Sequence, residues 1–540
     1  MNEKSKVVLG VDVGSTSVRA LAVDALSGRM LASATESLEI HRPSPGWAEQ
    51  SSDQIWTATG AAIRSALHSA AIDVESVVGI GFDATCSLVV LGPQDEPLAV
   101  SLESESKWNV IMWMDHRAGK EAEDINRTAH DCLKSVGGKI SLEMEPPKLL
   151  WLKRNHRQTF DSATKFLDLA DFLTYKATGV DIRSLCTVVC KWGYQASSNS
   201  QSWDCTYWNS IGLPEFANDV RRIGAQVRNP GERIASGLSP EAAQSLGLCA
   251  GTPVATGIID AHAGTIGCLA TKTSETTQSQ IPLDQRLSLI CGTSTCHMML
   301  SETARYVPGI WGPYYGAVLP AMFLNEAGQS AAGSVLDMLL ERKRAETGVT
   351  PAVSEVTAYL DRSEAERGAL AVAETARNLH VWPDYHGNRS PFADPSMKGA
   401  IVGLTLDWTS DAYLPTIYLA HVFALAYGTK LIAETLEQNG HKAIEVVYAC
   451  GGLAKNRHYM QVHADVLNVP IVVPNCDESV ALGSAILASV AANIYPSLKE
   501  AMVALGQPGT TYYPRDELQT FHAWKYSKFR DLGNFIAHFK

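Results

Sequence analysis

Alternating runs of apolar and turn-forming residues open the chain and predict a small antiparallel sheet. Three strands are expected, at residues 7–13, 17–24 and 29–38. The turns between them contain Gly14 and Gly28, and glycine is typical of tight turns. A helix is expected over 52–70, followed by a buried strand over 77–82. This order of elements is typical of a layered α/β domain.

A second strand–turn–strand pattern follows half a chain later. Its turn begins at Gly292, which lies 278 positions after Gly14. Such spacing predicts an internal duplication with two similar domains. The polar stretch 271–282 reads as an exposed connection, and we place the domains at 1–275 and 276–540. Further elements are expected as strands at 287–291, 295–300 and 445–450 and as helices within 341–367, 455–467 and 478–492.

Charge and hydropathy restrict the partners and the location of the protein. The chain has 57 acidic and 45 basic residues, and this excess of negative charge disfavours nucleic acid as a partner. No continuous apolar run reaches the roughly 18 residues of a membrane helix, so no membrane partner is expected. Asp12 interrupts the N-terminal apolar run, unlike the core of a signal peptide.

The cysteines do not show a recognisable framework. There are 11 of them, scattered along the chain, and no C-x-x-C occurs. The closest pair is Cys186 and Cys190. Disulfide frameworks and zinc sites normally show clustered, paired spacing, so we expect reduced thiols in a cytoplasmic protein.

Two glycine-led turns are candidates for binding phosphate. In the first, Asp12 ends a buried strand and Gly14-Ser15-Thr16 follow; in the second, Gly292-Thr293-Ser294 occupy the same place without the aspartate. Successive backbone N–H groups in such turns can hold an anion. A carboxylate beside phosphate implies a bridging Mg²⁺, so Asp12 is a candidate metal ligand. The alternative is that both turns are ordinary hairpins.

Asp260 is the candidate general base. An apolar strand delivers it to the start of a segment of small residues, and in α/β domains ligands bind at the carboxyl ends of strands. Its carboxylate could accept a proton from a sugar hydroxyl. The alternative is that Asp260 is the N-cap of a helix.

A glycine pair marks a possible nucleotide site near the end of the chain. Gly451 and Gly452 follow a predicted strand, and Asn456 lies near the start of the next helix. A glycine corner allows a nucleotide to approach the backbone closely, although many strand-to-helix turns look similar. The glycines of the chain form neither a P-loop nor a dinucleotide-binding motif.

The order of these features resembles the actin-like sugar kinases, and specifically the FGGY carbohydrate kinase family. The resemblance covers about residues 7–500. It rests on further elements, Gly46-Trp47-Ala48-Glu49-Gln50, Trp113-Met114-Asp115-His116-Arg117, Pro147-Lys148-Leu149-Leu150-Trp151 and Arg389-Ser390-Pro391. It implies an α/β fold with two actin-like, ribonuclease H-like domains that face each other across a catalytic cleft, with sugar bound mainly by the first domain and ATP by the second.

Several segments are similar to the ribulokinases, namely Cys190-Lys191-Trp192 and Asn325-Glu326-Ala327-Gly328-Gln329-Ser330. The longer segment from Trp382 to Pro391 resembles the D-ribulokinase branch in particular. The resemblance implies sugar contacts from Ala84, Thr85, Cys86, Asp115, Lys191, Asp260 and Glu326. It implies ATP contacts from Gly14, Ser15, Thr16, Gly292, Thr293, Ser294, Gln329, Gly451, Gly452 and Asn456, and Mg²⁺ held near Asp12 and Asp260. Glu145 departs from the family pattern, which has Thr, Ser or Pro at that position.

The expected reaction is phosphorylation of D-ribulose to D-ribulose 5-phosphate. Alternatives are an L-ribulokinase, another pentulose or pentitol kinase, and a non-enzymatic actin-like ATPase. Without the resemblance, Lys191 would be read as a helix-surface lysine beside Trp192, and Glu326 as a solvated loop acid. A homodimer is expected only from the resemblance.

Overall fold

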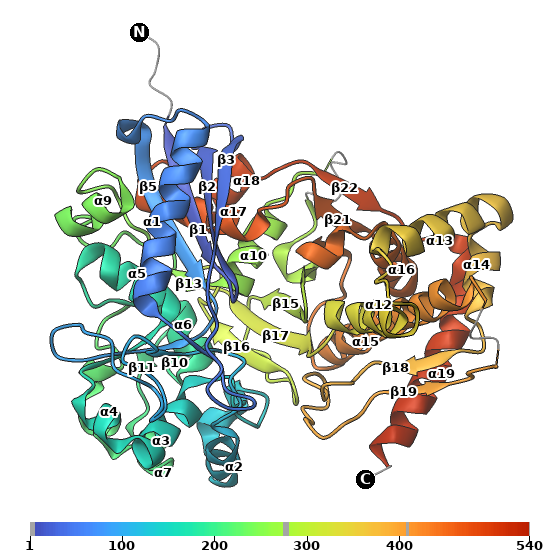
Figure 1. Cartoon of the computed structure of the whole chain (residues 1–540), viewed down its shortest axis with the longest axis horizontal. Coiled ribbons are helices and arrows are strands. Elements are labelled where there is room, and N and C mark those ends of the chain that lie inside the picture. Colours follow the sequence, from blue (N-terminus) through green and yellow to red (C-terminus); the bar gives the residue numbers. More distant parts are fainter. Residues whose placement is uncertain (1–5, 274–279, 407–409, 539–540) are drawn as a thin grey trace. The chain divides into compact units, whose positions relative to one another are not determined.

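The chain folds into two compact units that each combine non-contiguous segments. The computed structural model describes residues 6–273, 280–406 and 410–538 (Figure 1). The first unit consists of Met1–Lys272, Ser301–Asn325 and Glu478–Pro508. The second consists of Thr273–Leu300, Glu326–Asp477 and Gly509–Lys540. The boundary predicted at residue 275 lies close to one of these divisions, but two segments of the C-terminal half, Ser301–Asn325 and Glu478–Pro508, belong to the first unit. Half of the predicted connection, residues 274–279, lies outside the described residues.

A five-stranded sheet forms the centre of the first unit. Its order is β13–β5–β1–β2–β3, with bounds Ile258–Ile259, Val77–Ala84, Val7–Val13, Ser17–Asp24 and Met30–Ser37. The predicted N-terminal strands are therefore confirmed. β1 runs antiparallel to β2 and parallel to β5, and β13 runs parallel to β5. The carboxyl ends of β1, β5 and β13 consequently lie at one edge of the sheet.

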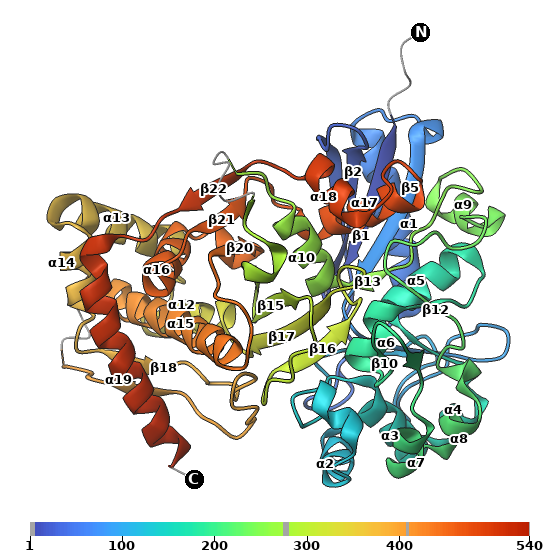
Figure 2. The same ribbon diagram turned by 180° about the vertical axis from the view of Figure 1, so that it is seen from behind.

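Helices cover both faces of this sheet. The predicted first helix, α1 (Ser52–Ser69), packs on β2 and β3, with Ser51 as its N-cap (Figure 1). On the opposite face α17 (Ser479–Ala491) packs on β1 and β5 and also on α10 (Asp260–Leu269) (Figure 2). A segment from near the end of the chain thus completes the layered core of the first unit.

The other elements of the first unit include a second, smaller sheet of order β4–β7–β6–β8. Its strands are Glu49–Gln50, Val110–Ile111, Leu88–Leu91 and Lys165–Asp168. The helices that matter for the site are α2 (Gly119–Arg127), α3 (Glu145–Asn155), α5 (Leu169–Thr178) and α6 (Leu185–Lys191), together with strand β16 (Trp311–Tyr315). The remaining helices are α4 (Arg157–Ser162), α7 (Cys205–Ser210), α8 (Pro214–Asn218), α9 (Pro240–Leu246) and α18 (Leu498–Leu505).

The sheet of the second unit repeats the connectivity of the first. Its strands run in the order β17–β15–β14–β20–β21–β22. Their bounds are Phe323–Gln329, Thr295–Ser301, Arg286–Cys291, Val446–Cys450, Ile471–Pro474 and Gly509–Tyr512. β14 is antiparallel to β15 and parallel to β20, as β1 is to β2 and β5. The predicted duplication is therefore confirmed at the level of topology.

One long helix, α15 (Tyr413–Gln438), forms the apolar centre of the second unit. It is long and apolar enough to cross a membrane by length and average composition, although no continuous apolar run in the sequence indicated this. Within its most apolar stretch 78% of the residues are buried, which is typical of a core helix. Among the described residues, the unit also contains α12 (Gly333–Thr347), α13 (Val353–Arg367), α14 (Ala369–Thr375), α16 (Arg457–Leu467) and α19 (Gln519–Ala537).

Candidate active site

Three aspartates meet at the carboxyl ends of the parallel strands of the first unit. Asp12 and Asp83 are paired residues on β1 and β5, and Asp83 is also paired with Ile258 on β13. Asp260 follows β13 directly and begins α10. The sheet register therefore brings the two predicted carboxylates together and adds Asp83, which the sequence analysis did not select.

Burial raises the pKa of both Asp12 and Asp83, and repulsion between neighbouring carboxylates adds to the rise at Asp83. Burial raises the pKa of Asp12, and Arg19, whose Nη1 lies 3.5 Å from Asp12 Oδ2, opposes that rise. Burial raises the pKa of Asp83 well above its usual value, and the charges of Asp12 and Asp260 raise it further. Ser484 on α17 donates to Asp83 Oδ2 at 2.6 Å. Asp83 Oδ1 has no hydrogen-bond partner among the described residues. Such clustered carboxylate oxygens fit a hard cation such as Mg²⁺.

Asp260 does not cap its helix. The N-cap of α10 is Ile259, and Asp260 is the first helical residue, so the capping alternative is wrong. Its Oδ1 accepts a hydrogen bond from the backbone N–H of Ala261 at 2.6 Å. The side chain is only half-buried. A carboxylate with this exposure at a strand end can accept a proton from a ligand hydroxyl.

The Gly14 turn is held in place by side chains from two segments outside the main sheet, one containing Gln50 and one containing Trp113. Gly14 N–H donates to Ser17 O at 3.0 Å and closes the turn. Trp113 Nε1 donates to Ser15 Oγ at 2.9 Å, and Gln50 Nε2 donates to Ser15 O at 2.9 Å. These contacts give Trp113 and Gln50 a positioning role that the sequence alone did not assign.

The matching turn of the second unit is closed in a similar way. Gly292 N–H donates to Ser294 O at 2.9 Å. Residues at the start of α12 also hydrogen-bond to this turn. Ala332 N–H donates to Thr293 O at 2.8 Å, and Gly333 N–H donates to Gly292 O at 3.1 Å. Both predicted phosphate turns therefore exist as defined hairpins.

The Gly451–Gly452 corner is confirmed as a strand-to-helix turn after β20. Gly451 has a φ of 97°, and a Cβ there would overlap the backbone of Cys291, so only glycine fits. A Cβ on Gly452 would meet nothing within 4 Å, so the backbone is open to a ligand at this point. Asn456 caps α16 by accepting from the N–H groups of His458 and Tyr459.

Gln329, the remaining predicted nucleotide contact, is buried at the end of β17. Its Nε2 donates to the carbonyl of Leu425 on α15 at 2.8 Å. Glu326 lies on the same strand and is also buried, so the alternative of a solvated loop acid is wrong.

Lys191 is buried rather than exposed on a helix surface, which overturns that alternative. Lys191 is the last residue of α6 and is only 3% exposed. Its Nζ lies 4.4 Å from the centre of the Trp311 ring on β16, a cation–π arrangement. Its charge lowers the pKa of the Cys86 thiol, which burial raises well above the usual value. Lys191 and Cys86, both predicted sugar contacts, therefore share one buried environment.

Other charged residues near Cys86 were not predicted from the sequence. Glu145, Lys148 and Asp168 all influence the Cys86 thiol electrostatically, and all three are fully buried. Lys148 Nζ lies 3.0 Å from Glu145 Oε2, yet neither side chain makes a hydrogen bond of normal geometry within the described residues. Asp168 Oδ2 likewise has no hydrogen-bond partner there. Buried polar atoms without partners are costly, and a ligand rich in hydroxyl groups would satisfy them.

The predicted sugar contacts Ala84 and Thr85 are held mainly by backbone contacts with the neighbouring strands. Ala84 is the last residue of β5 and pairs with both Val13 and Ile259. Thr85 N–H donates to Val13 O at 3.0 Å, and its Oγ1 lies 3.1 Å from Ser87 Oγ. The segment therefore connects the aspartate cluster to Cys86.

Asp115 is fully engaged by protein donors. Arg117 donates through Nε to Oδ1 and through Nη2 to Oδ2, each at 2.8 Å, and Ala48 N–H donates to Oδ2 at 2.7 Å. Arg117 also pairs with Glu49 and stacks on Trp47 at 4.2 Å. This buried network joins the segment that contains Gln50 to the segment that contains Trp113. The geometry therefore gives Asp115 a role in positioning these two segments.

The raised pKa of Glu145 predicts the direction in which the stability of the protein changes with pH. Burial raises its pKa from 4.5 to about 7, against the lowering effect of Lys148. The native state therefore binds a proton that the unfolded state releases between these pH values. The resulting stabilisation is present below pH 4.5 and is lost as pH rises through about 7.

We expect Glu145→Gln to remove this contribution. Relative to wild type, the variant should gain stability between pH 4.5 and 7.5 by an amount on the order of 3 kcal/mol. Denaturant unfolding at both pH values measures the change, and Glu143→Gln, a nearby acid that is less buried, serves as the control. Equal pH dependence in wild type and Glu145→Gln would contradict the assignment.

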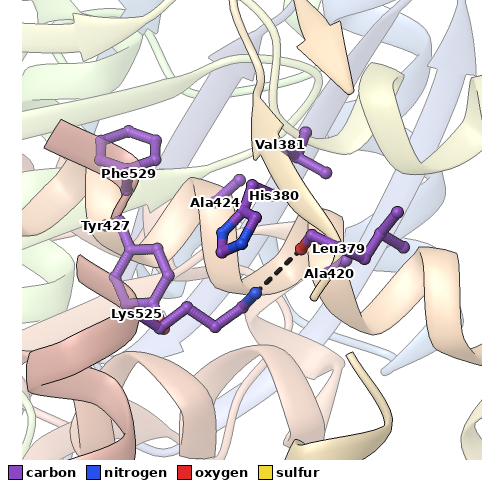
Figure 3. Close-up of a pocket in the computed structure, with 8 residues that line it drawn as sticks. All are labelled: Leu379, His380, Val381, Ala420, Ala424, Tyr427, Lys525 and Phe529. Atoms are coloured by element: carbon purple, nitrogen blue, oxygen red, sulfur yellow. Dashed lines mark hydrogen bonds between the residues drawn. The ribbon is translucent and has the colours of Figure 1, made fainter. Parts of the chain in front are cut away.

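A small cavity in the second unit is too small to be a substrate site. Its volume is about 10 Å³, enough for about one water molecule. Lys525 Nζ donates a hydrogen bond to the carbonyl of Leu379 at 2.9 Å (Figure 3). It also donates to the carbonyl of Arg377 at 2.9 Å. The lining residues are Leu379, His380, Val381, Ala420, Ala424, Tyr427, Lys525 and Phe529. Lys525 therefore ties α19 to the loop before β18 (His380–Trp382).

Comparison with known proteins defines the class of the molecule. Its fold is similar to that of a xylulose kinase from Rhodospirillum rubrum, with a TM-score of 0.78 over 99% of both chains at 22% sequence identity. The fold is that of the two-domain, actin-like sugar kinases.

The sequence matches are more specific. Residues 7–267 match the N-terminal domain and residues 287–492 the C-terminal domain of the FGGY family of carbohydrate kinases. The chain belongs to this family and is an ATP-dependent carbohydrate kinase. It is 44% identical to an FGGY carbohydrate kinase domain-containing protein of Xenopus laevis, over 97% of this chain and 96% of that protein. It is 36% identical to a D-ribulokinase of Saccharomyces cerevisiae, over 93% of this chain and 74% of the yeast protein.

Proposed function

We propose that the protein transfers phosphate from ATP to the C5 hydroxyl of D-ribulose. The choice of a polyhydroxylated substrate rests on the cluster of buried polar residues around Cys86. Within the described residues, Glu145, Lys148 and Asp168 of this cluster have side-chain atoms without hydrogen-bond partners. A polyhydroxylated ligand supplies both donors and acceptors to such a site. The similarity to the yeast D-ribulokinase favours the D-pentulose among such ligands.

The first unit supplies the proposed sugar site. Lys191, fixed against Trp311, donates hydrogen bonds to sugar oxygens. Asp260 accepts the proton of the attacking hydroxyl, because its half-buried carboxylate stands at the carboxyl end of β13. Glu326, a buried acid on the part of β17 that belongs to the second unit, stays a prediction from the family resemblance.

The turns that begin at Gly14 and Gly292 are proposed to bind the phosphates of ATP. The backbone N–H groups of Ser15 and Thr16 are proposed to hold phosphate oxygens in the first unit, and those of Thr293 and Ser294 in the second. Asp12, Asp83 and Asp260 would hold Mg²⁺, which neutralises phosphate charge when bound. Gly452 leaves the backbone open for adenosine. Positioning and charge neutralisation are most of what phosphoryl transfer requires.

The rival function is that of an actin-like ATPase without a sugar substrate. Such a protein has no need of buried hydrogen-bonding groups without partners beside Cys86. Membership of a carbohydrate kinase family also disfavours it. The cytoplasmic location, the homodimer and the expectation that nucleic acid and membrane are not partners remain part of the proposal.

Substrate specificity is the direct test. We expect kcat/KM for D-ribulose to exceed that for L-ribulose, D-xylulose, ribitol and glycerol. A wrong epimer leaves a buried polar group unpaired at roughly 1–3 kcal/mol, which corresponds to about 5- to 150-fold. Glycerol has too few hydroxyl groups to satisfy the site and should be the poorest substrate.

The measurement uses all five compounds with one enzyme preparation and identifies the phosphorylated carbon of the product. A higher kcat/KM for any of the other four would overturn the D-ribulose assignment while leaving the kinase activity intact. ATP hydrolysis that no sugar stimulates would instead contradict the sugar site itself.

A further inference from the structure

Two cysteines and a histidine converge in the buried core of the first unit. Cys186 and Cys190 lie one helical turn apart on α6, and His262 lies in the first turn of α10. One ligand atom from each residue lies within 4.8 Å of the other two. All three residues are fully buried, at no more than 1% exposure for the cysteines. This group could not be recognised from the sequence, because His262 lies 72 positions after Cys190.

The spacing of the donors is close to that of a zinc site. Around a tetrahedral Zn²⁺, a thiolate sulfur and an imidazole nitrogen stand about 3.6 Å apart and two thiolate sulfurs about 3.8 Å apart, given the usual bond lengths. Cys190 Sγ lies 3.4 Å from His262 Nε2. The 4.8 Å limit means that each remaining donor pair needs an inward shift of about 1 Å or less.

We propose that Cys186, Cys190 and His262 form a Zn²⁺-binding site that ties α6 to α10. Two thiolates and a neutral imidazole give a complex with Zn²⁺ that has no net charge, as a buried position requires. A monovalent soft ion bound by the same ligands would leave one negative charge uncompensated. Mg²⁺ prefers oxygen ligands and is not expected here.

Zinc at this position would act on the proposed sugar site, and this part of the inference rests on the proposed function. Cys190 immediately precedes Lys191, and His262 is two residues after Asp260. Drawing the donors together shifts the end of α6 toward the start of α10. A misplacement of about 1 Å between groups that bind and activate a substrate can cost up to 10²-fold in rate. We therefore expect zinc to inhibit the kinase.

Binding is tested without reference to activity. Metal-free, reduced protein is titrated anaerobically with Co²⁺, which reports thiolate ligation through a charge-transfer absorption band, and then with Zn²⁺ as competitor. Wild type is expected to bind one thiolate-ligated ion per chain and to show the band. Cys190→Ser and His262→Gln are expected to lose it. Absorption-edge spectroscopy of zinc-loaded wild type should show two sulfur ligands, a result that does not depend on any variant folding.

A second three-donor group provides the matched control. His130, Cys132 and Asp204 also lie close together, but Cys132 Sγ donates a hydrogen bond to Asp204 Oδ2 at 3.3 Å and the group is partly exposed. Cys132→Ser should keep the cobalt band and the zinc inhibition. The proposal is wrong if wild type shows no band, if the band survives in Cys190→Ser, or if Cys132→Ser abolishes it. Zinc ligation without inhibition would contradict only the coupling to the sugar site.

Discussion

Replacement of Asp260 by asparagine is expected to lower kcat by about 10²–10⁴-fold, the usual contribution of a general base. Asparagine has nearly the same shape, and its side-chain oxygen can still accept the hydrogen bond from Ala261 N–H. It cannot take a proton from a sugar hydroxyl or supply charge to Mg²⁺. Asp260 is only half-buried and does not cap α10, so the thermal stability of the variant should stay close to that of wild type.

Asp53→Asn is the matched control for this experiment. Asp53 is an exposed acid in the first turn of α1, as Asp260 is an acid in the first turn of α10. Both substitutions remove one negative charge near a helix N-terminus, but only one should affect turnover. Activity of Asp260→Asn within about threefold of wild type would exclude a proton-accepting role. A large fall in the melting temperature would assign the loss to folding instead.

The pattern of apolar residues was sufficient to predict the elements that are local in sequence. The first three strands and α1 are correct to within a residue or two, because alternation, turn glycines and a serine cap act over a few positions. The duplication was also visible, since the turns at Gly14 and Gly292 have the same local requirement for a tight hairpin.

The composition of the compact units could not be derived in the same way. The segment Glu478–Pro508 returns to the first unit, and its helix α17 was predicted but not placed. Its location depends on contacts with β1 and β5, almost the whole chain away. No local pattern encodes such packing.

The site shows the same limit. Asp12 and Asp260 were selected because each ends a strand followed by a turn or a helix. Asp83 was not, because its significance arises from its register opposite Asp12. Glu145 stood out only as a departure from a family pattern, and Lys148 only as part of an element that matches it. Only the structure shows that both are buried without hydrogen-bond partners among the described residues. Asp115 was selected because it lies in a segment that resembles a family motif. In the structure, both of its carboxylate oxygens accept hydrogen bonds from protein donors.

The aspartate cluster depends on two glycines that let α17 approach the sheet. Gly10 and Gly81 are paired on β1 and β5, two residues before Asp12 and Asp83. Because side chains alternate along a strand, the glycines and the aspartates lie on the same face. α17 covers that face, and its Ser484 hydrogen-bonds to Asp83. The missing side chains at the glycines therefore set the distance at which α17 can shelter the carboxylates.

Gly10→Ala is accordingly expected to destabilise the first unit by about 3 kcal/mol or more, at the upper end of the effect of overpacking a core. A Cβ on Gly10 would overlap the carbonyl oxygen of Ala481 and come within 2.7 Å of the backbone nitrogen of Ala485. These are backbone atoms, so relief requires movement of α17 itself. That movement would also disturb the hydrogen bond from Ser484 to Asp83, and activity should fall even where the protein remains folded.

Gly119→Ala tests whether the effect is specific to the approach of α17. Gly119 begins α2 in the same unit, and a Cβ there would meet nothing within 4 Å. Alanine at this helical position should be neutral or stabilise by up to about 1 kcal/mol. Denaturant unfolding and kcat of both variants provide the measurements. If Gly10→Ala and Gly119→Ala change stability equally, close packing of α17 does not determine the geometry of the aspartate cluster.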